Sequence, residues 1–255
     1  MSWSAKQYSL FETERNRPIQ DLLDRIPTQT VQTAADIGCG PGNSTELLQN
    51  RFPGSIITGM DNSPDMLEAA RQRLPNTRFE LAGIATWTNP GPFDLILANA
   101  ALQWVPDHKS VLPELLAKLA PGGSLAIQMP DNFDEPAHRL MRETAAAGPW
   151  AEKLSGAASR QERHPAAWYY GLLRHRVRSL DIWRTTYYHP LAGGAAAVVE
   201  WFKGTGLRPY LAGLNSSEQQ AFLDQYQRAI PPAYPAFPDG MVLLPFPRLF
   251  IVAVR

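Results

Sequence analysis

Short apolar segments alternate with amphipathic ones between residues 31 and 130, and this rhythm predicts a sheet flanked by helices. The apolar segments are short and rich in Ile, Leu and Ala, which suits strands that are buried on both faces. The first predicted strand ends near Ile37, and the other four span 55–60, 77–82, 93–98 and 124–129. Strands that alternate with helices favour an α/β fold with a doubly wound, mostly parallel sheet.

The pattern differs before and after this core. In the leader, residues 1–30, the spacing of Ile19, Leu22, Leu23 and Ile26 predicts a helix. Further helices are predicted near 136–147, near 149–159 and within 193–229, and further strands at 181–189 and 249–254. We expect three regions: a leader or lid (1–30), a ligand-binding core (31–132) and a remainder (133–255). The remainder completes the sheet and inserts helical caps at about 133–172 and 193–235.

A glycine-rich turn follows the first predicted strand, in the sequence Asp36-Ile37-Gly38-Cys39-Gly40-Pro41-Gly42. Glycines without side chains allow a ligand to lie against bare backbone. Asn43 stands where a dinucleotide fingerprint would have its third glycine, and no lysine of the triphosphate-binding type follows. The acid at Asp36 favours a positively charged ligand over a phosphate. Asn43, Ser44 or Thr45 is expected to cap the next helix.

Polar residues also stand at the ends of the next predicted strands. Asp61 ends the second strand, where a carboxylate can accept from the two adjacent hydroxyls of a ribose. Ser63 is predicted to cap the helix that begins at Pro64. The fourth strand ends at 99–104, which should open into a ligand crevice at the carboxyl ends of the strands.

Composition narrows the possible partners. The chain has 24 Lys and Arg against 24 Asp and Glu, so no basic field favours nucleic acid or an anionic membrane. No apolar run approaches the roughly 18 residues of a membrane span, and the first residues lack the apolar core of a signal peptide. Cys39 is the single cysteine and is expected to be an apolar filler, and no metal site is predicted. We expect a cytoplasmic, monomeric protein with a small-molecule partner.

The glycine turn resembles the first motif of the class I S-adenosylmethionine-dependent methyltransferases. The resemblance implies a Rossmann-like fold and S-adenosylmethionine as the cofactor. Related enzymes commonly have an acid at the position of Gly83, where it accepts from the adenine amino group. Because this chain lacks that acid, the adenine would be held by stacking and backbone contacts, against Ile84 or Trp87. The residues that the resemblance implies around the cofactor are Asp36, Gly38, Cys39, Gly40, Asp61, Asn62, Met66, Gly83, Ile84, Asn99 and Ala100.

Methyl transfer from a sulfonium is an in-line displacement in which the enzyme mainly positions the reactants. A hydroxyl or phenol acceptor would need a general base, whereas a carboxylate is ionised at neutral pH and needs none. The five histidines are scattered and offer no compelling base. The leader and C-terminal region instead offer cations such as Arg15, Arg17, Arg184 and Arg248, which can clamp carboxylates. Strand alternation over 183–189 predicts Arg184 and Tyr188 on one face, with Tyr187 and His189 on the other.

Further blocks narrow the resemblance to the trans-aconitate 2-methyltransferase family. These blocks lie in the leader, in the glycine turn, and at 98–104, 128–132, 181–189 and 247–253. The resemblance implies that a carboxylate of trans-aconitate, or of a related small tricarboxylate, is converted to a monomethyl ester. The residues expected around the substrate are Tyr8, Arg17, Gln103, Trp104, Arg184, Tyr187, Tyr188, His189 and Arg248. The alternatives are a methyltransferase for another small molecule and a non-catalytic cofactor-binding module.

Overall fold

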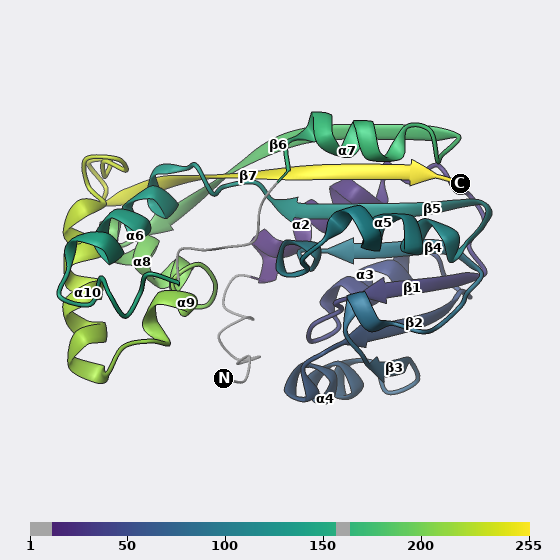
Figure 1. The fold of residues 1–255 in the computed structure, drawn as a ribbon, viewed down its shortest axis with the longest axis horizontal. Coiled ribbons are helices and arrows are strands. Elements are labelled where there is room, and N and C mark those ends of the chain that lie inside the picture. The colour runs from purple at the N-terminus through teal and green to yellow at the C-terminus, as the bar shows by residue number, and fades with distance from the viewer. Residues whose placement is uncertain (1–11, 157–163) are drawn as a thin grey trace. The chain divides into compact units, whose positions relative to one another are not determined.

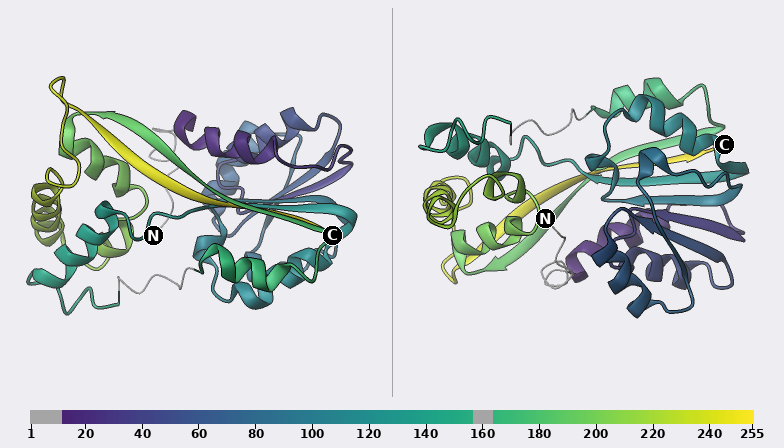
Figure 2. Two further views of the ribbon diagram at one scale, coloured as in Figure 1. Left: turned by 90° about the horizontal axis from the view of Figure 1, so that it is seen from above. Right: turned by 60° about the horizontal axis from the view of Figure 1, so that its bottom comes forward.

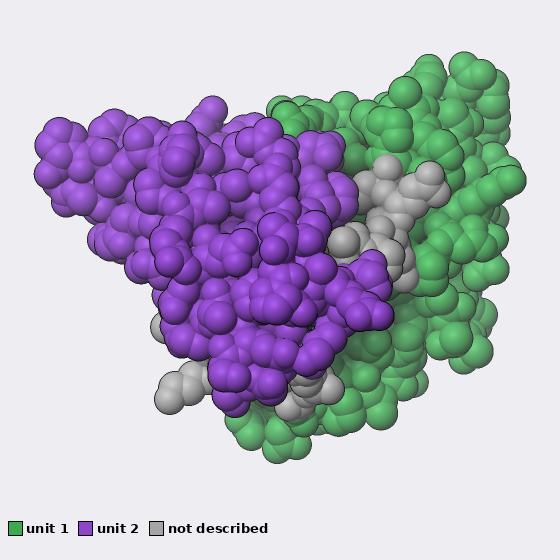
Figure 3. Space-filling view, turned by 60° about the vertical axis from the view of Figure 1, so that its left-hand side comes forward, with its two compact units in different colours: residues 1–130, 161–185, 248–255 green, residues 131–160, 186–247 purple. Residues whose placement is uncertain are grey.

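A computed structural model describes residues 12–156 and 164–255 of the chain (Figure 1). These residues form two compact units, coloured separately in Figure 3. Of the described residues, 12–130, 164–185 and 248–255 belong to unit 1, and 131–156 and 186–247 belong to unit 2. Tyr8, predicted to meet the substrate, lies outside the described residues, as do the rest of residues 1–11 of the predicted lid and the side chain of Arg15. No helix in the described ranges has the length and apolarity to cross a lipid bilayer.

The described residues form a sheet of seven strands in the order β3-β2-β1-β4-β5-β7-β6. The first five in this order are parallel, and β7 runs antiparallel to β5. The strands are β1 (Thr33–Ile37), β2 (Ile56–Asp61), β3 (Arg78–Leu81), β4 (Phe93–Asn99), β5 (Leu119–Pro130), β6 (Ser179–Ala192) and β7 (Met241–Val254). The strand order reverses between β1 and β4, so the carboxyl ends of these strands form the switch point at which open α/β sheets bind ligands. The predicted doubly wound, mostly parallel sheet is confirmed.

Helices cover both faces of the sheet in unit 1. Figure 2 shows α2 (Glu12–Leu23) and α3 (Asn43–Arg51) on one face, and α5 (His108–Ala117) and α7 (Ala166–Leu173) on the other. The helix α4 (Pro64–Arg73) packs against β2 and β3, and two short 3-10 helices follow at Ile84–Thr86 (η2) and Leu102–Trp104 (η3).

The apolar spacing identified from the sequence forms the core of unit 1. All four predicted core residues of the leader, Ile19, Leu22, Leu23 and Ile26, are buried. Side chains from α5 and α7 pack with those of the central strands into one hydrophobic cluster. Trp87 belongs to this cluster, and its ring stacks on Phe93 with a centroid separation of 5.4 Å. The suggestion that Trp87 stacks on an adenine is therefore wrong, because the core already covers its ring.

The described residues of unit 2 form their own interior. It is built from residues 186–192 of β6, residues 241–247 of β7 and four helices. These are α6 (Pro136–Ala147), α8 (Gly194–Lys203), α9 (Arg208–Leu211) and α10 (Ser216–Ala229). The phenols of Tyr226 and Tyr234 tie α10 and its following turn to α6, through the carbonyl and the amide of Ala137 respectively. Residues 164–172, which we expected in a cap insertion at about 133–172, lie in unit 1.

Two local predictions fail and one is confirmed. The cap of α3 is Gly42 and not Asn43, Ser44 or Thr45. The cap of α10 is Asn215, which forms a capping box with Glu218. The helix expected near 149–159 is absent from its described part, where residues 149–156 form turns. Ser63 caps α4 as predicted, accepting from the amide of Met66.

Candidate cofactor and substrate site

The glycine turn connects β1 to α3 at the switch point of the sheet. The amides of Gly38 and Cys39 both donate to the carbonyl of Met60, at 2.7 and 2.9 Å, so the turn is fixed to the end of β2. Gly38 has a φ of +74°, and a Cβ built on it would lie 2.4 Å from the Cβ of Ala101. Gly38 is therefore required both by its left-handed conformation and by the close approach of the loop that follows β4.

Asp36 is a fully buried carboxylate at the end of β1. Its Oδ2 accepts hydrogen bonds of 2.7 Å from the hydroxyls of both Ser44 and Thr45. These bonds explain why neither hydroxyl caps α3. The other oxygen, Oδ1, is buried and accepts no hydrogen bond from the described residues. Burial raises the pKa of Asp36 to about 6, despite the two hydroxyl donors and with a smaller contribution from the nearby negative charge of Asp61.

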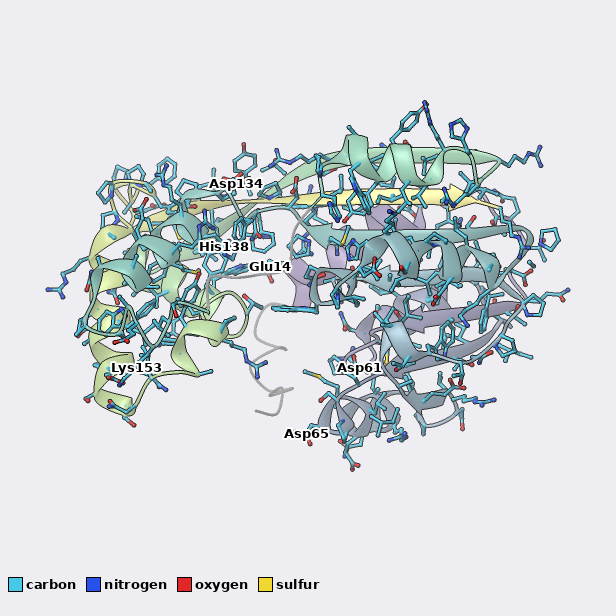
Figure 4. All side chains as sticks on the ribbon, in the orientation of Figure 1. Glu14, Asp61, Asp65, Asp134, His138 and Lys153 are labelled. Atoms are coloured by element: carbon cyan, nitrogen blue, oxygen red, sulfur yellow. The ribbon has the colours of Figure 1, made fainter. Side chains whose placement is uncertain are left out.

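Asp61 ends β2 and faces the same turn (Figure 4). Its Oδ2 accepts from the amide of Gly40 at 3.0 Å, and its Oδ1 accepts from the amide of Ser63 at 2.9 Å. Each carboxylate oxygen has a second lone pair, so Asp61 can accept further hydrogen bonds from a pair of vicinal hydroxyls. The backbone contacts hold the carboxylate in one orientation beside the turn.

Asn62, Met66, Gly83 and Ile84 are also among the residues expected around the cofactor. Ile84 lies close to Gly38, with its Cδ1 3.7 Å from the position of an added Cβ. Met66 is buried in the first turn of α4, whereas Asn62 is exposed. Gly83 has a φ of −89°, which any residue can adopt, so the backbone does not require a glycine where related enzymes have an acid.

Cys39 is buried within the turn, and its exposed fraction is 1%. Its Sγ contacts the carbonyl oxygen of Gly40 at 3.7 Å. Burial raises the pKa of the thiol well above its usual range, reinforced by the negative charges of Asp36 and Asp61. The thiol is therefore unsuited to nucleophilic chemistry.

The loop after β4 lies on the other side of the switch point. Ala100 adopts a φ of +50°, uncommon for a residue with a side chain. Its carbonyl accepts from Nε2 of Gln103 at 2.6 Å. The remaining amide oxygen of Gln103, Oε1, is buried and has no partner among the described residues. Trp104 ends η3 and is 41% exposed.

A row of buried polar side chains crosses β4, β5 and β7 at this edge. Nη1 of Arg248 donates to Oε1 of Gln128 at 2.8 Å, and Nε2 of Gln128 donates to Oδ1 of Asn99 at 2.5 Å. Asn99 and Gln128 are direct neighbours in the parallel register, and Arg248 pairs with Pro130 in the antiparallel one. Gln128 was not predicted as a site residue from the sequence. Its signal was a single amide within the apolar run Ala126-Ile127-Gln128-Met129.

His108 supports this loop from below. It is buried, with Nε2 2.8 Å from the carbonyl oxygen of Leu102 and Nδ1 2.7 Å from the hydroxyl of Tyr169. A carbonyl can only accept, so Nε2 carries the proton and Nδ1 accepts from the phenol. Burial lowers the pKa of His108, which favours this neutral form. Both ring nitrogens are engaged in holding η3 against α7.

The other residues expected at the substrate are divided between the units. Arg17 on α2 and Arg184 on β6 are exposed and belong to unit 1. Tyr187, Tyr188 and His189 belong to unit 2. The predicted alternation is confirmed there, since Tyr188 is exposed while Tyr187 and His189 are buried. His189 stacks on Trp201 with a centroid separation of 4.5 Å.

Comparisons with known proteins agree with this geometry. Residues 34–123 match a family described as a methyltransferase domain. The trans-aconitate 2-methyltransferase of Azoarcus sp. (strain BH72) is 52% identical over 254 residues, covering 100% of this chain and 99% of that protein. The protein of the same name from Variovorax paradoxus (strain S110) is 53% identical over 258 residues, again covering 100% and 99%.

A solved structure, phosphoethanolamine N-methyltransferase 2 of Haemonchus contortus with phosphomonomethylethanolamine and S-adenosylhomocysteine, shares the fold. Its TM-score is 0.57 at 16% identity, over 94% of this chain and 52% of that one. The full-length matches at about half identity extend through both units, well beyond the methyltransferase domain. The chain therefore belongs to the trans-aconitate 2-methyltransferase family of class I S-adenosylmethionine-dependent methyltransferases.

Proposed function

We propose that this enzyme transfers the methyl group of S-adenosylmethionine to a carboxylate oxygen of trans-aconitate, or of a closely related small tricarboxylate, to form a monomethyl ester. The observation that carries the proposal is the match of about 52% identity along the whole chain to enzymes named for this substrate. A match confined to residues 34–123 would have supported a methyltransferase without supporting its substrate.

The cofactor is proposed to lie along the glycine turn, where the nearby side-chain groups are acceptors. Oδ1 of Asp36 and Oε1 of Gln103 are both buried and unpartnered among the described residues, so each can accept from a cationic amino group. Asp61 is proposed to accept from the ribose hydroxyls. When bound, S-adenosylmethionine supplies a methyl group that leaves its sulfonium sulfur as a carboxylate oxygen of the substrate attacks.

The substrate carboxylates are proposed to meet donors near the carboxyl ends of β4 and β5 and at Arg248 in the middle of β7. Arg248 is buried at this edge, and a guanidinium sheltered from water interacts strongly with a carboxylate. Arg17 and Arg184 are proposed to act at the rim because their side chains are exposed. The roles of Tyr8, Gln103, Trp104, Tyr187, Tyr188 and His189 in substrate binding are proposed from the family resemblance.

Direct attack by the carboxylate requires no general base, and the histidines of unit 1 fit that mechanism. Both nitrogens of His108 are occupied, and the ring of His164 stacks on Trp168 with a centroid separation of 3.6 Å. His175 is exposed and lies three residues before Arg178. The amide of Arg178 donates to the carbonyl of Val254, which lies at the end of the strands opposite to Asn99. In the described part of unit 1, no histidine is thus available beside Asn99.

The test is a methyl-transfer assay across di- and tricarboxylic acids, phenols and amines, paired with calorimetry of S-adenosylhomocysteine binding. We expect binding of S-adenosylhomocysteine and turnover that is highest with trans-aconitate. Robust turnover of a phenol or an amine in place of the acids would show a methyltransferase for another small molecule. Binding without turnover of any acceptor would show a non-catalytic module, and either result overturns the proposal.

A further inference from the structure

We propose that Gln128 is a positioning residue that sets the direction of hydrogen-bond donation in the site. Its side chain holds Arg248 for the substrate and orients the side-chain amide of Asn99 so that Nδ2 points toward the cofactor. This inference rests on the proposed function. Gln128 is the central member of the row Arg248–Gln128–Asn99, and its side chain is completely buried. The first sign of its importance is its location, because a buried amide within an apolar strand requires partners on both sides.

The chemistry of the row allows one direction of donation. A guanidinium has only donors, so the atom of Gln128 that faces Arg248 must be the carbonyl oxygen Oε1. Nε2 of Gln128 therefore faces Asn99 and requires an acceptor, which is Oδ1. The amide of Asn99 is thereby oriented so that Nδ2 is directed away from Gln128. Asn99 can then present an N–H donor at the switch point of the sheet.

The main chain of Gln128 supports the same segment independently. Its carbonyl oxygen accepts from the amide of Ala100 at 2.8 Å, next to Asn99 in the loop. The carbonyl of Ala100 in turn accepts a hydrogen bond from Nε2 of Gln103. Because these backbone contacts survive a change of the Gln128 side chain, substitutions can remove the polarity of the row without removing the support of the loop.

Because the three side chains of the row are buried, a change in the direction of their hydrogen bonds leaves donors or acceptors unsatisfied. The exposed fractions of Asn99, Gln128 and Arg248 are 8%, 0% and 5%, so water has little access to replace a lost partner. Removing one member of a buried hydrogen-bonded set leaves the other groups without compensation. A purely structural role would alter stability in this way, but it would not alter cofactor and substrate affinity separately.

Two substitutions at this position separate the two sides of the row. Gln128→Met has a similar length and deletes both side-chain hydrogen bonds. Gln128→Glu keeps an acceptor for Arg248 but removes the donor to Asn99. In that variant the Asn99 amide is expected to turn over and donate Nδ2 to the introduced carboxylate, so that Oδ1 is presented instead.

The experiment measures the KM for trans-aconitate, the Kd of S-adenosylhomocysteine by calorimetry, and the melting temperature, all at pH 8. For Gln128→Met we expect the KM to rise at least tenfold and the Kd at least fivefold. For Gln128→Glu we expect the same rise in the Kd, at least fivefold, but a larger rise in the KM than in Gln128→Met, because the introduced carboxylate pairs with Arg248 and neutralises the charge proposed to hold the acid. A KM that differs between the two variants while the Kd does not is the specific signature of a positioning role.

Ser124→Ala is the matched control. Ser124 is also completely buried on β5, on the same face of the strand, and its hydroxyl bonds to that of Thr28 at 2.6 Å. Its loss should lower the melting temperature with the KM and Kd unchanged. Gln128 variants that lower only the melting temperature, as Ser124→Ala should, would overturn the proposal.

The remaining outcomes are also decisive. If Gln128→Met does not fold, Gln128→Glu alone decides, and equal changes in its KM and Kd would contradict the larger rise expected in the KM. If the wild type binds S-adenosylhomocysteine but does not turn over trans-aconitate, the proposed substrate is wrong while the Kd of Gln128→Glu still tests the role of Gln128. Failure of the wild type to bind S-adenosylhomocysteine would overturn both.

Discussion

The two sides of the switch point are built on different physical principles. At the ends of β1 and β2, a glycine turn and two carboxylates, Asp36 and Asp61, form a surface of bare backbone and acceptors. At the carboxyl ends of β4 and β5 and in the middle of the antiparallel β7, the row from Arg248 to Asn99 provides directed donors. The first side depends on backbone geometry and the second on side-chain hydrogen bonding.

This difference is the one that methyl transfer to a carboxylate requires. The cofactor is cationic at its sulfonium and amino groups, so acceptors and negative charge favour it. The acceptor acid is anionic, so donors and a sheltered guanidinium favour it. We therefore expect substitutions on the β1–β2 side to act mainly on cofactor affinity and replacement of Arg248 itself to act mainly on the acid, whereas Gln128, which bonds both Arg248 and Asn99, affects both.

The largest effect is expected from Gly38→Ala. The left-handed φ of +74° costs a side chain about 1–2 kcal/mol, and the collision with Ala101 adds about 1–3 kcal/mol. Because the collision displaces both sides of the site, we expect binding of S-adenosylhomocysteine to weaken about a hundredfold, which corresponds to about 2.8 kcal/mol. Calorimetry and urea unfolding measure the two effects.

Gly54→Ala is the control for this substitution. Gly54 has a φ of +89°, but a Cβ built on it has nothing within 4 Å. This variant should show the conformational cost of about 1–2 kcal/mol and unchanged binding. Equal loss of binding in the two variants would contradict a role for the close approach of Gly38 and Ala101.

Asp61→Ala should follow in size. It removes a carboxylate held by the amides of Gly40 and Ser63, together with the acceptors proposed for the ribose. Hydrogen bonds to a charged group contribute about 1.5–3 kcal/mol, so we expect about a 10- to 100-fold rise in the Kd of S-adenosylhomocysteine. Asp65→Ala, in the exposed first turn of α4, removes the same charge nearby and should change the Kd less than twofold.

Arg248→Ala tests the other side of the comparison. We expect the KM for trans-aconitate to rise about 10- to 30-fold, because a charge-assisted contact is lost, with the Kd of S-adenosylhomocysteine nearly unchanged. The bond between Gln128 and Asn99 remains in this variant. The exposed Arg184 should give a smaller rise in KM when replaced by Ala, since solvent screens its charge. A KM unaffected by either substitution would exclude both arginines from the substrate site.

The smallest predicted effect is a dependence of cofactor binding on pH. The pKa of Asp36 is raised to about 6 by burial, so its carboxylate becomes protonated as the pH falls below that value. If the ionised form accepts from the amino group of the cofactor, binding of S-adenosylhomocysteine should be about tenfold weaker at pH 5 than at pH 7. Asp36→Asn should remove this dependence, as measured by calorimetry at both pH values.

The same raised pKa predicts a change in stability. Between about pH 4 and pH 6 the folded chain holds a proton on Asp36 that the unfolded chain has released, so the free energy of unfolding falls as the pH rises. The contribution of this one group across the window is about 3 kcal/mol at most. It appears as the difference in urea unfolding between the wild type and Asp36→Asn, and the opposite sign would contradict the raised pKa.

The alternation of strands and helices along the chain was predictable because it depends on local apolar periodicity. The glycine turn was predictable because its glycines lie close together in the sequence. Asp61 and Asn99 were predictable as candidates because each directly ends an apolar strand. The pairing of Asp36 with Ser44 and Thr45 was not, since the same hydroxyls suit a helix cap equally well. Gln128 was missed because its two partners lie on other strands, and no local pattern records a contact across 120 residues, as between Gln128 and Arg248.

The most direct test of the account is to identify the product formed from trans-aconitate and S-adenosylmethionine with a deuterated methyl group. We predict one added methyl group per molecule of acid, and release of deuterated methanol on treatment with mild base, as a carboxyl ester requires. A methylated product that resists base, or no transfer by an enzyme that binds S-adenosylhomocysteine, would contradict the assignment of a carboxylate oxygen as the acceptor.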